Sequence, residues 1–121
     1  MRDAAKLADD YITLWNETDA TRRARLLAET WASDATFVDP LMSGAGLQEI
    51  EGLIVAVQAR FPEFFFQLIG CADGFGDKAR FSWAFGPAGE EAVIKGTDFV
   101  VREGDRIKSV TGFLDLMPAA A

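Results

Sequence analysis

The chain has 121 residues, half of them hydrophobic, a length and composition that suit one domain with its own core. Lysine and arginine number 12 against 19 aspartate and glutamate residues, giving a net charge of -7. We therefore expect no nucleic acid and no anionic membrane surface as a partner. The chain has no histidine, which excludes serine-histidine-aspartate and cysteine-histidine catalysis and every metal site that needs a histidine ligand. Carboxylates, tyrosine, lysine and arginine remain for acid-base work.

The single cysteine, Cys71, cannot form a disulfide within the chain and offers no metal cluster. The first residues are charged and do not form an apolar signal core. The longest apolar run, Leu53 to Val57, is too short to span a bilayer. These features predict a soluble, unprocessed, cytoplasmic protein.

Three segments have the spacing of amphipathic helices. The first covers residues 3–16. The second follows a capping signal at Thr18-Asp19 and ends near residue 31, and the third runs from Leu47 to about Arg60. Residues 35–39 alternate as a short strand that Pro40 ends, and residues 43–46 have the composition of a turn.

From Phe61 onward the hydrophobic period changes from 3.6 to 2. Strands are predicted at 64–71, 79–85, 92–102 and 106–116, and the short turns between them favour antiparallel neighbours. This order predicts an α+β fold in which three N-terminal helices pack on one face of a strongly curved, mostly antiparallel sheet. One domain is expected over residues 1–117, with residues 118–121 as a tail.

A curved sheet wrapped over a helix leaves a cone whose wide end is either filled or left as a pocket. The chain has ten phenylalanines, three tryptophans and one tyrosine. These side chains either fill the core or line an apolar pocket for a small hydrophobic molecule. The residues expected to line the pocket are Trp15, Met42, Phe61, Trp83, Val100 and Phe113.

Three polar side chains are predicted to lie in apolar surroundings. Tyr11 lies on the apolar face of the first helix, either as an ordinary core tyrosine or with its hydroxyl group in the pocket. Asp39 ends a strand before Pro40, where it either caps the next turn or faces the pocket. Asp98 alternates with aliphatic residues, but the opposite face of its strand is equally apolar and would leave it in solvent. The opposite face consists of Val93, Thr97, Phe99 and Val101.

With these residues in place, the whole chain resembles the nuclear-transport-factor-two-like superfamily of cone-shaped α+β domains, and within it the SnoaL-like and ketosteroid isomerase groups. In ketosteroid isomerases, a tyrosine on the first helix, an aspartate of an Asp-Pro pair and an aspartate on a late strand form the active site. Tyr11, Asp39 and Asp98 fall on these positions. The stretches that carry the resemblance are Asp10-Tyr11-Ile12-Thr13-Leu14-Trp15-Asn16, Trp31-Ala32-Ser33-Asp34-Ala35-Thr36-Phe37-Val38-Asp39-Pro40 and Gly96-Thr97-Asp98-Phe99-Val100-Val101.

The resemblance implies proton transfer on a small hydrophobic ketone without a metal or another cofactor. Asp39 would be the base that removes a proton next to the carbonyl group. Tyr11 and a protonated Asp98 would donate hydrogen bonds to the dienolate oxygen, which requires apolar surroundings for Asp98. Asp115, near the end of the last strand, is a second candidate for the base.

Other functions are also compatible with these residues. An inward Arg80 would allow Asp39 and Asp98 to activate water as in the limonene-epoxide-hydrolase group, although alternation places Arg80 outward. A polyketide-cyclase-like enzyme is a further alternative, and a non-catalytic ligand-binding or dimerisation module would need only the cone. A homodimer through the open sheet face is expected, because one helical layer does not cover all the aromatic residues of the strands. These are Phe81, Trp83, Phe85, Phe99 and Phe113.

Overall fold

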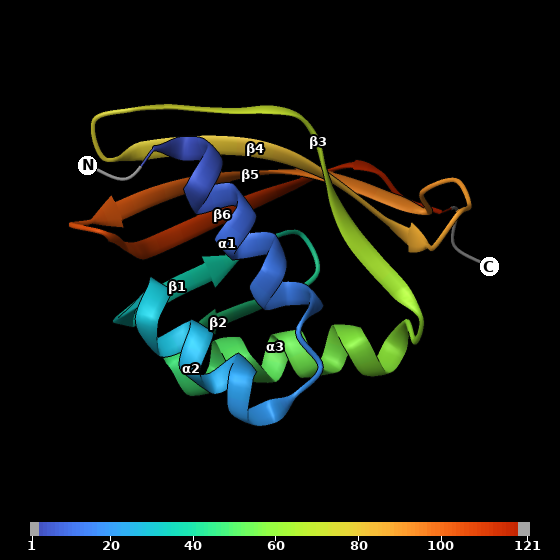
Figure 1. The fold of residues 1–121 in the computed structure, drawn as a ribbon, viewed down its shortest axis with the longest axis horizontal. Helices are drawn as coiled ribbons and strands as arrows, with labels where there is room; N and C mark the ends of the chain where they lie inside the picture. The colour runs from blue at the N-terminus through green and yellow to red at the C-terminus, as the bar shows by residue number, and fades with distance from the viewer. Residues whose placement is uncertain (1–2, 119–121) are drawn as a thin grey trace.

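The computed structural model describes residues 3–118, which form three helices and six strands around one apolar core (Figure 1). Residues 1, 2 and 119–121 lie outside the described part, and with them most of the expected tail. The helices are α1 (Ala4–Asn16), α2 (Ala20–Thr30) and α3 (Leu47–Arg60). The strands are β1 (Trp31–Val38), β2 (Ser43–Ala45), β3 (Phe64–Phe75), β4 (Lys78–Pro87), β5 (Ile94–Glu103) and β6 (Arg106–Leu116).

The first two helices begin at aspartate caps. Asp3 accepts a hydrogen bond from the amide of Lys6 at 2.8 Å, and Asp19 accepts one from the amide of Arg22 at 2.9 Å. At the end of α1, the Asn16 side chain donates to the carbonyl oxygen of a β3 residue, Phe66, and accepts from its amide, at 2.9 and 2.8 Å. These two hydrogen bonds hold the start of the edge strand β3 against the helix.

The strands form one sheet in the order β2-β1-β6-β5-β4-β3. The predicted antiparallel pairing from β3 to β6 is confirmed, and β2 is antiparallel to β1. The pair β1 and β6 is parallel, with Val38 opposite Thr111. The residue after Val38 therefore reaches the level of Gly112, which is paired with Asp98 on its other side. The topology thus brings the end of β1 close to the middle of β5.

Two predicted turns differ from the structure. Residues 43–45 form β2, because they pair with Thr36–Val38, and this tertiary contact overrides their turn-like composition. The strand β3 continues to Phe75, since Asp73–Phe75 pair with Lys78–Arg80 and leave only Gly76 and Asp77 for the turn. The α+β fold class, with three helices on a mostly antiparallel sheet, is confirmed.

The helices lie on one side of the curved sheet (Figure 1). Three of the five aromatic residues expected on an open face, Phe81, Trp83 and Phe85, are instead buried on the helix side. The open side carries Phe99 and Phe113, whose rings meet edge to face with centroids 5.6 Å apart. Of the five aromatic residues expected on the open face, only Phe99 and Phe113 therefore lie there. No helix among residues 3–118 is long and apolar enough to cross a membrane.

Candidate functional site

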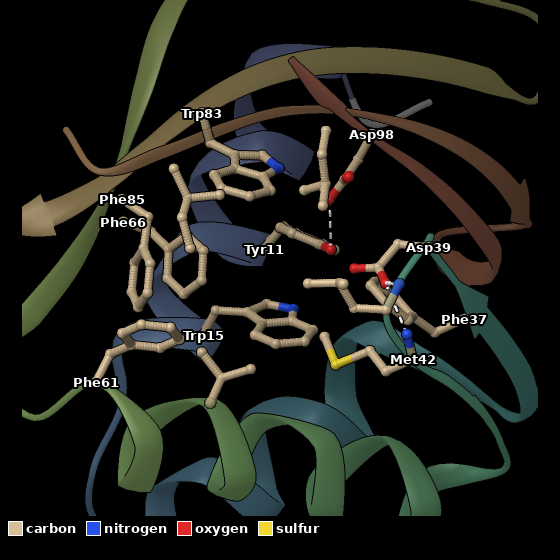
Figure 2. A pocket seen from close by; sticks show the side chains of 14 residues that line it. Tyr11, Trp15, Phe37, Asp39, Met42, Phe61, Phe66, Trp83, Phe85 and Asp98 are labelled. Carbon is tan, nitrogen blue, oxygen red and sulfur yellow. Dashed lines mark hydrogen bonds between the residues drawn. The ribbon is translucent and has the colours of Figure 1, made fainter. Parts of the chain in front are cut away.

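A cavity of about 90 Å³ lies between α1, the concave face of the sheet and α3 (Figure 2). Its wall is almost entirely apolar except at one side, where Tyr11, Asp39 and Asp98 lie. The rings of Phe61, Phe66 and Phe85 lie on the opposite side of the cavity, whereas Phe37 lies beside Asp39. The complete lining is Tyr11, Trp15, Phe37, Asp39, Leu41, Met42, Val57, Phe61, Phe66, Trp83, Phe85, Ile94, Asp98 and Leu114.

Four of the six expected pocket residues, Trp15, Met42, Phe61 and Trp83, line this cavity. The structure corrects the expectation for the other two. Val100 has the same facing as Asp98 but lies farther along β5, where it is buried in the core. Phe113 lies on the opposite face of the sheet and is 53% exposed, because alternation along β6 turns its neighbours Gly112 and Leu114 inward.

Tyr11 and Asp98 form a buried pair at the polar side of the cavity. The Tyr11 hydroxyl group donates a hydrogen bond to Oδ2 of Asp98 at 2.6 Å, and both residues are less than 5% exposed. Asp98 therefore lies on the inward face of β5, which settles the alternation that the sequence left open. The Tyr11 ring is held edge to face by Phe81, with centroids 4.8 Å apart. Packing thus fixes the hydroxyl group in place.

Burial raises the pKa of Asp98 to about 6, and the nearby charges of Asp39 and Asp115 act in the same direction. Hydrogen bonds from Tyr11 and Trp83 oppose this rise by favouring the carboxylate. Burial and the same carboxylate raise the pKa of Tyr11 well above 10, so its hydroxyl group keeps its proton. The pKa of Asp98 is thus raised toward neutral pH, in the direction of the protonated form that the resemblance implies.

Asp39 closes the tight turn between β1 and β2. Its Oδ1 accepts hydrogen bonds from the amides of Leu41 and Met42 at 2.8 and 2.9 Å, and its own amide donates to the Met42 carbonyl oxygen at 3.0 Å. Both side-chain bonds end on Oδ1, so neither uses Oδ2. Asp39 also lines the cavity. The sequence left open whether Asp39 caps the turn or faces the pocket. In the structure its side chain does both.

Gly112 separates the two aspartates and was not singled out from the sequence. A β-carbon at this position would lie 2.7 Å from Oδ1 of Asp98 and 3.2 Å from the β-carbon of Asp39. Only a residue without a side chain lets both acids approach the same point of β6. The parallel pairing of β1 with β6, which creates this contact, leaves no signal in local hydrophobic periodicity.

Two further candidates lie outside the cavity. Arg80 is exposed and pairs with Asp73 at 3.1 Å, so it is not available for water activation beside Asp39 and Asp98. Asp115, the second candidate base, is on the outer face and accepts a hydrogen bond from the Thr97 hydroxyl group at 2.7 Å. Among residues 3–118, no three histidine, cysteine, aspartate or glutamate side chains are grouped as metal ligands.

The raised pKa of Asp98 predicts a pH dependence of stability. Because the folded protein holds this proton more tightly than an unfolded chain with a pKa of 3.8, the contribution of Asp98 is most favourable below pH 4 and is lost as pH rises to about 6. The loss amounts to about 3 kcal/mol. Urea unfolding of the wild type and Asp98→Asn between pH 4 and 7 measures it. The wild type is expected to lose stability relative to the variant over this range, and a constant difference would contradict the raised pKa.

With this geometry established, comparison with known proteins identifies the family. A model described as SnoaL-like domain matches residues 8–110. A structure of a candidate isomerase of the SnoaL-like family from Agrobacterium tumefaciens shares 40% sequence identity, covers 95% of this chain and 99% of its own, and superposes with a TM-score of 0.89. The chain therefore belongs to the SnoaL-like family.

More distant structures share the fold. A candidate ketosteroid isomerase from Kribbella flavida is 18% identical, with a TM-score of 0.69 over 98% of this chain and 79% of its own. A candidate SnoaL-like polyketide cyclase from Jannaschia is 10% identical, with a TM-score of 0.71 over 95% of this chain and 89% of its own. The comparison with curated proteins gave no match. These structures share the cone-shaped fold with this chain, but their names give different activities.

Proposed function

We propose that this protein is a cofactor-independent isomerase that enolises a small hydrophobic ketone. The observation that carries the proposal is the buried hydrogen bond between Tyr11 and Asp98 at one side of an apolar cavity that Asp39 also lines. Apolar walls hold the carbon skeleton, and the polar side receives the carbonyl oxygen. The 40% identical relative, named as a candidate isomerase, supports the same class of reaction.

In this proposal Asp39 is the base. Its carboxylate removes a proton from the carbon next to the carbonyl group, the electrons of the broken C–H bond form a C=C bond, and the carbonyl π electrons move to oxygen. Return of the proton to the γ-carbon of an unsaturated ketone shifts the double bond. The Tyr11 hydroxyl group turns from Asp98 and donates to the enolate oxygen. That negative charge raises the pKa of Asp98 further, which favours the protonated, hydrogen-bond-donating form.

The size of the cavity points to a small substrate. Its volume of about 90 Å³ is below the roughly 150 Å³ of an engineered apolar cavity that holds benzene. Even a ligand of one ring therefore needs small movements of the lining side chains or reaches toward the mouth, and a larger skeleton needs more of both. We accordingly place single-ring ketones first among the substrates to test.

The test is the exchange of α-hydrogens of cyclohex-2-enone for deuterium in heavy water, followed by proton NMR. Enolisation by this site is expected to accelerate exchange over buffer, and Tyr11→Phe, which removes the hydroxyl group, is expected to reduce the acceleration by about 10²-fold to 10³-fold. A wild-type rate equal to that of buffer for this and other single-ring ketones would favour a non-catalytic ligand-binding module.

We also propose that two copies of the chain associate through the open face of the sheet. This face presents Phe65, Phe99 and Phe113, each more than 40% exposed, and no described helix covers it. Sedimentation equilibrium is expected to give twice the mass of the chain, and a monomer at all concentrations would contradict the association. The cytoplasmic location stays a prediction from the sequence.

A further inference from the structure

The indole of Trp15 is a hydrogen-bond donor without an acceptor at the cavity. Trp15 is 3% exposed and lines the cavity, and its Nε1 is a buried atom with no hydrogen-bond partner among the described residues. A buried donor is normally paired, because leaving it unpaired sacrifices the hydrogen bond it would make to water. An unpaired donor that faces a cavity indicates that the partner is a bound molecule.

Trp15 and Tyr11 are one helical turn apart on α1, so their side chains share one face of the helix. Their ring centroids are 6.0 Å apart. The Nε1 edge of Trp15 points to the side of the cavity where the Tyr11 hydroxyl group and Asp39 lie, away from the rings of Phe61, Phe66 and Phe85 (Figure 2). One rigid helix thus directs two donor groups to the same side of the cavity.

The other side-chain donors of the cavity are already occupied. Tyr11 gives its only proton to Asp98, and the indole of Trp83 hydrogen-bonds to the same carboxyl group. Asp39 and an ionised Asp98 are acceptors. The Trp15 indole lies beside the Tyr11 hydroxyl oxygen and opposes the rise in its pKa, but this contact does not have the geometry of a hydrogen bond. Among the residues that line the cavity, Trp15 therefore carries the side-chain donor that is left for a ligand.

We infer that the indole N–H of Trp15 donates a hydrogen bond to the oxygen of the bound ligand, and that the ligand is a ketone, enol or phenol whose oxygen lies between Trp15 and Tyr11. This inference rests on the proposed function and adds a ligand-binding donor that the resemblance did not imply. An indole N–H keeps its proton throughout the accessible pH range, so this hydrogen bond does not depend on the protonation of Asp98.

Trp31 supplies a matched control within the same chain. Its Nε1 is also buried without a hydrogen-bond partner among the described residues. Its ring stacks on Tyr11 with centroids 5.9 Å apart, but Trp31 is not part of the cavity lining. Trp83 lines the cavity with its N–H already engaged by Asp98. The three tryptophans of the chain therefore represent a free donor at the cavity, a free donor away from it, and an engaged donor.

The test uses the ¹⁵N-labelled full chain, whose three indole N–H signals are assigned with the single variants Trp15→Phe, Trp31→Phe and Trp83→Phe. The probes are 4-nitrophenol, which brings a phenol hydroxyl group into the cavity, and toluene, which has a similar ring but no oxygen. We expect 4-nitrophenol to move the Trp15 proton signal downfield, as a new hydrogen bond does, and to leave the Trp31 signal in place. Toluene is expected to produce no such downfield shift.

Affinities provide a second readout. Trp15→Phe is expected to weaken 4-nitrophenol binding about tenfold with little effect on toluene. Trp31→Phe alters the packing behind Tyr11 without removing a donor from the cavity, so it is expected to change both affinities by the same factor. Binding of 4-nitrophenol that depends on Tyr11 while the Trp15 signal stays in place would overturn the inference alone. Absence of any 4-nitrophenol binding would overturn the inference together with the proposed function.

Discussion

Asp39→Asn is expected to lower the rate of α-hydrogen exchange by about 10²-fold to 10⁴-fold, the range that a positioned general base contributes. An amide side chain cannot take the α-proton at neutral pH. Its carbonyl oxygen can still accept the hydrogen bonds that Oδ1 of Asp39 receives from Leu41 and Met42. The turn should therefore keep its conformation, and the free energy of unfolding should change by no more than about 0.5 kcal/mol. Exchange kinetics and urea unfolding of the same preparation measure the two effects.

Two further variants serve as the comparison and the control for Asp39→Asn. Asp39→Ala removes the turn hydrogen bonds as well as the base, so it is expected to lose stability in addition to activity. Asp115→Asn changes a carboxylate on the outer face, where it accepts from Thr97, and is expected to leave the exchange rate nearly unchanged. A rate in Asp39→Asn close to that of the wild type would show that another group is the base.

Gly112→Ala is expected to abolish measurable exchange, because the added methyl group would occupy the space that both aspartates share. It would lie 2.7 Å from Oδ1 of Asp98, closer than a carbon and an oxygen can approach without movement. Either the Asp98 side chain turns away from Tyr11 or β6 shifts from β5. Overpacking of this kind costs about 1–3 kcal/mol of stability. Exchange kinetics and thermal unfolding record the two losses.

Gly52→Ala is the matched control. Gly52 lies within α3, and a β-carbon there would meet no atom within 4 Å. Alanine favours the helix over glycine by up to about 1 kcal/mol, so this variant is expected to gain stability and keep full activity. Equal activity of Gly112→Ala and Gly52→Ala would contradict the arrangement of Asp39 and Asp98 around β6.

Much of the architecture could be predicted from local patterns in the sequence. Helical spacing over residues 3–16 and 47–60, together with alternation after Phe61, yields the helices, the last four strands and their antiparallel pairing. Tyr11 is on the predicted face of its helix because a 3.6-residue period determines facing directly. The resemblance added what periodicity could not decide, namely that Asp98 and not its neighbours faces inward.

The remaining features depend on contacts between distant segments. The short strand β2 and the parallel pairing of β1 with β6 arise from tertiary partners, so local composition indicated a turn for the first and nothing for the second. The role of Gly112 follows from that parallel pair. Phe113 was expected in the pocket on hydrophobicity alone, although alternation with Leu114 places it on the outer face. The alternation of inward and outward side chains along β6 is the sequence signal that places Phe113 on the outer face.

The position of the ligand oxygen tests the proposed site most directly, and a crystal structure of the protein with bound phenol measures it. We predict that the phenol oxygen lies within hydrogen-bond distance of the Tyr11 hydroxyl group, with the ring among the aromatic side chains of the cavity and Asp39 facing its edge. A phenol bound with its oxygen toward the mouth of the cavity, or bound only elsewhere on the protein, would contradict a site that stabilises an enolate beside Tyr11 and Asp98.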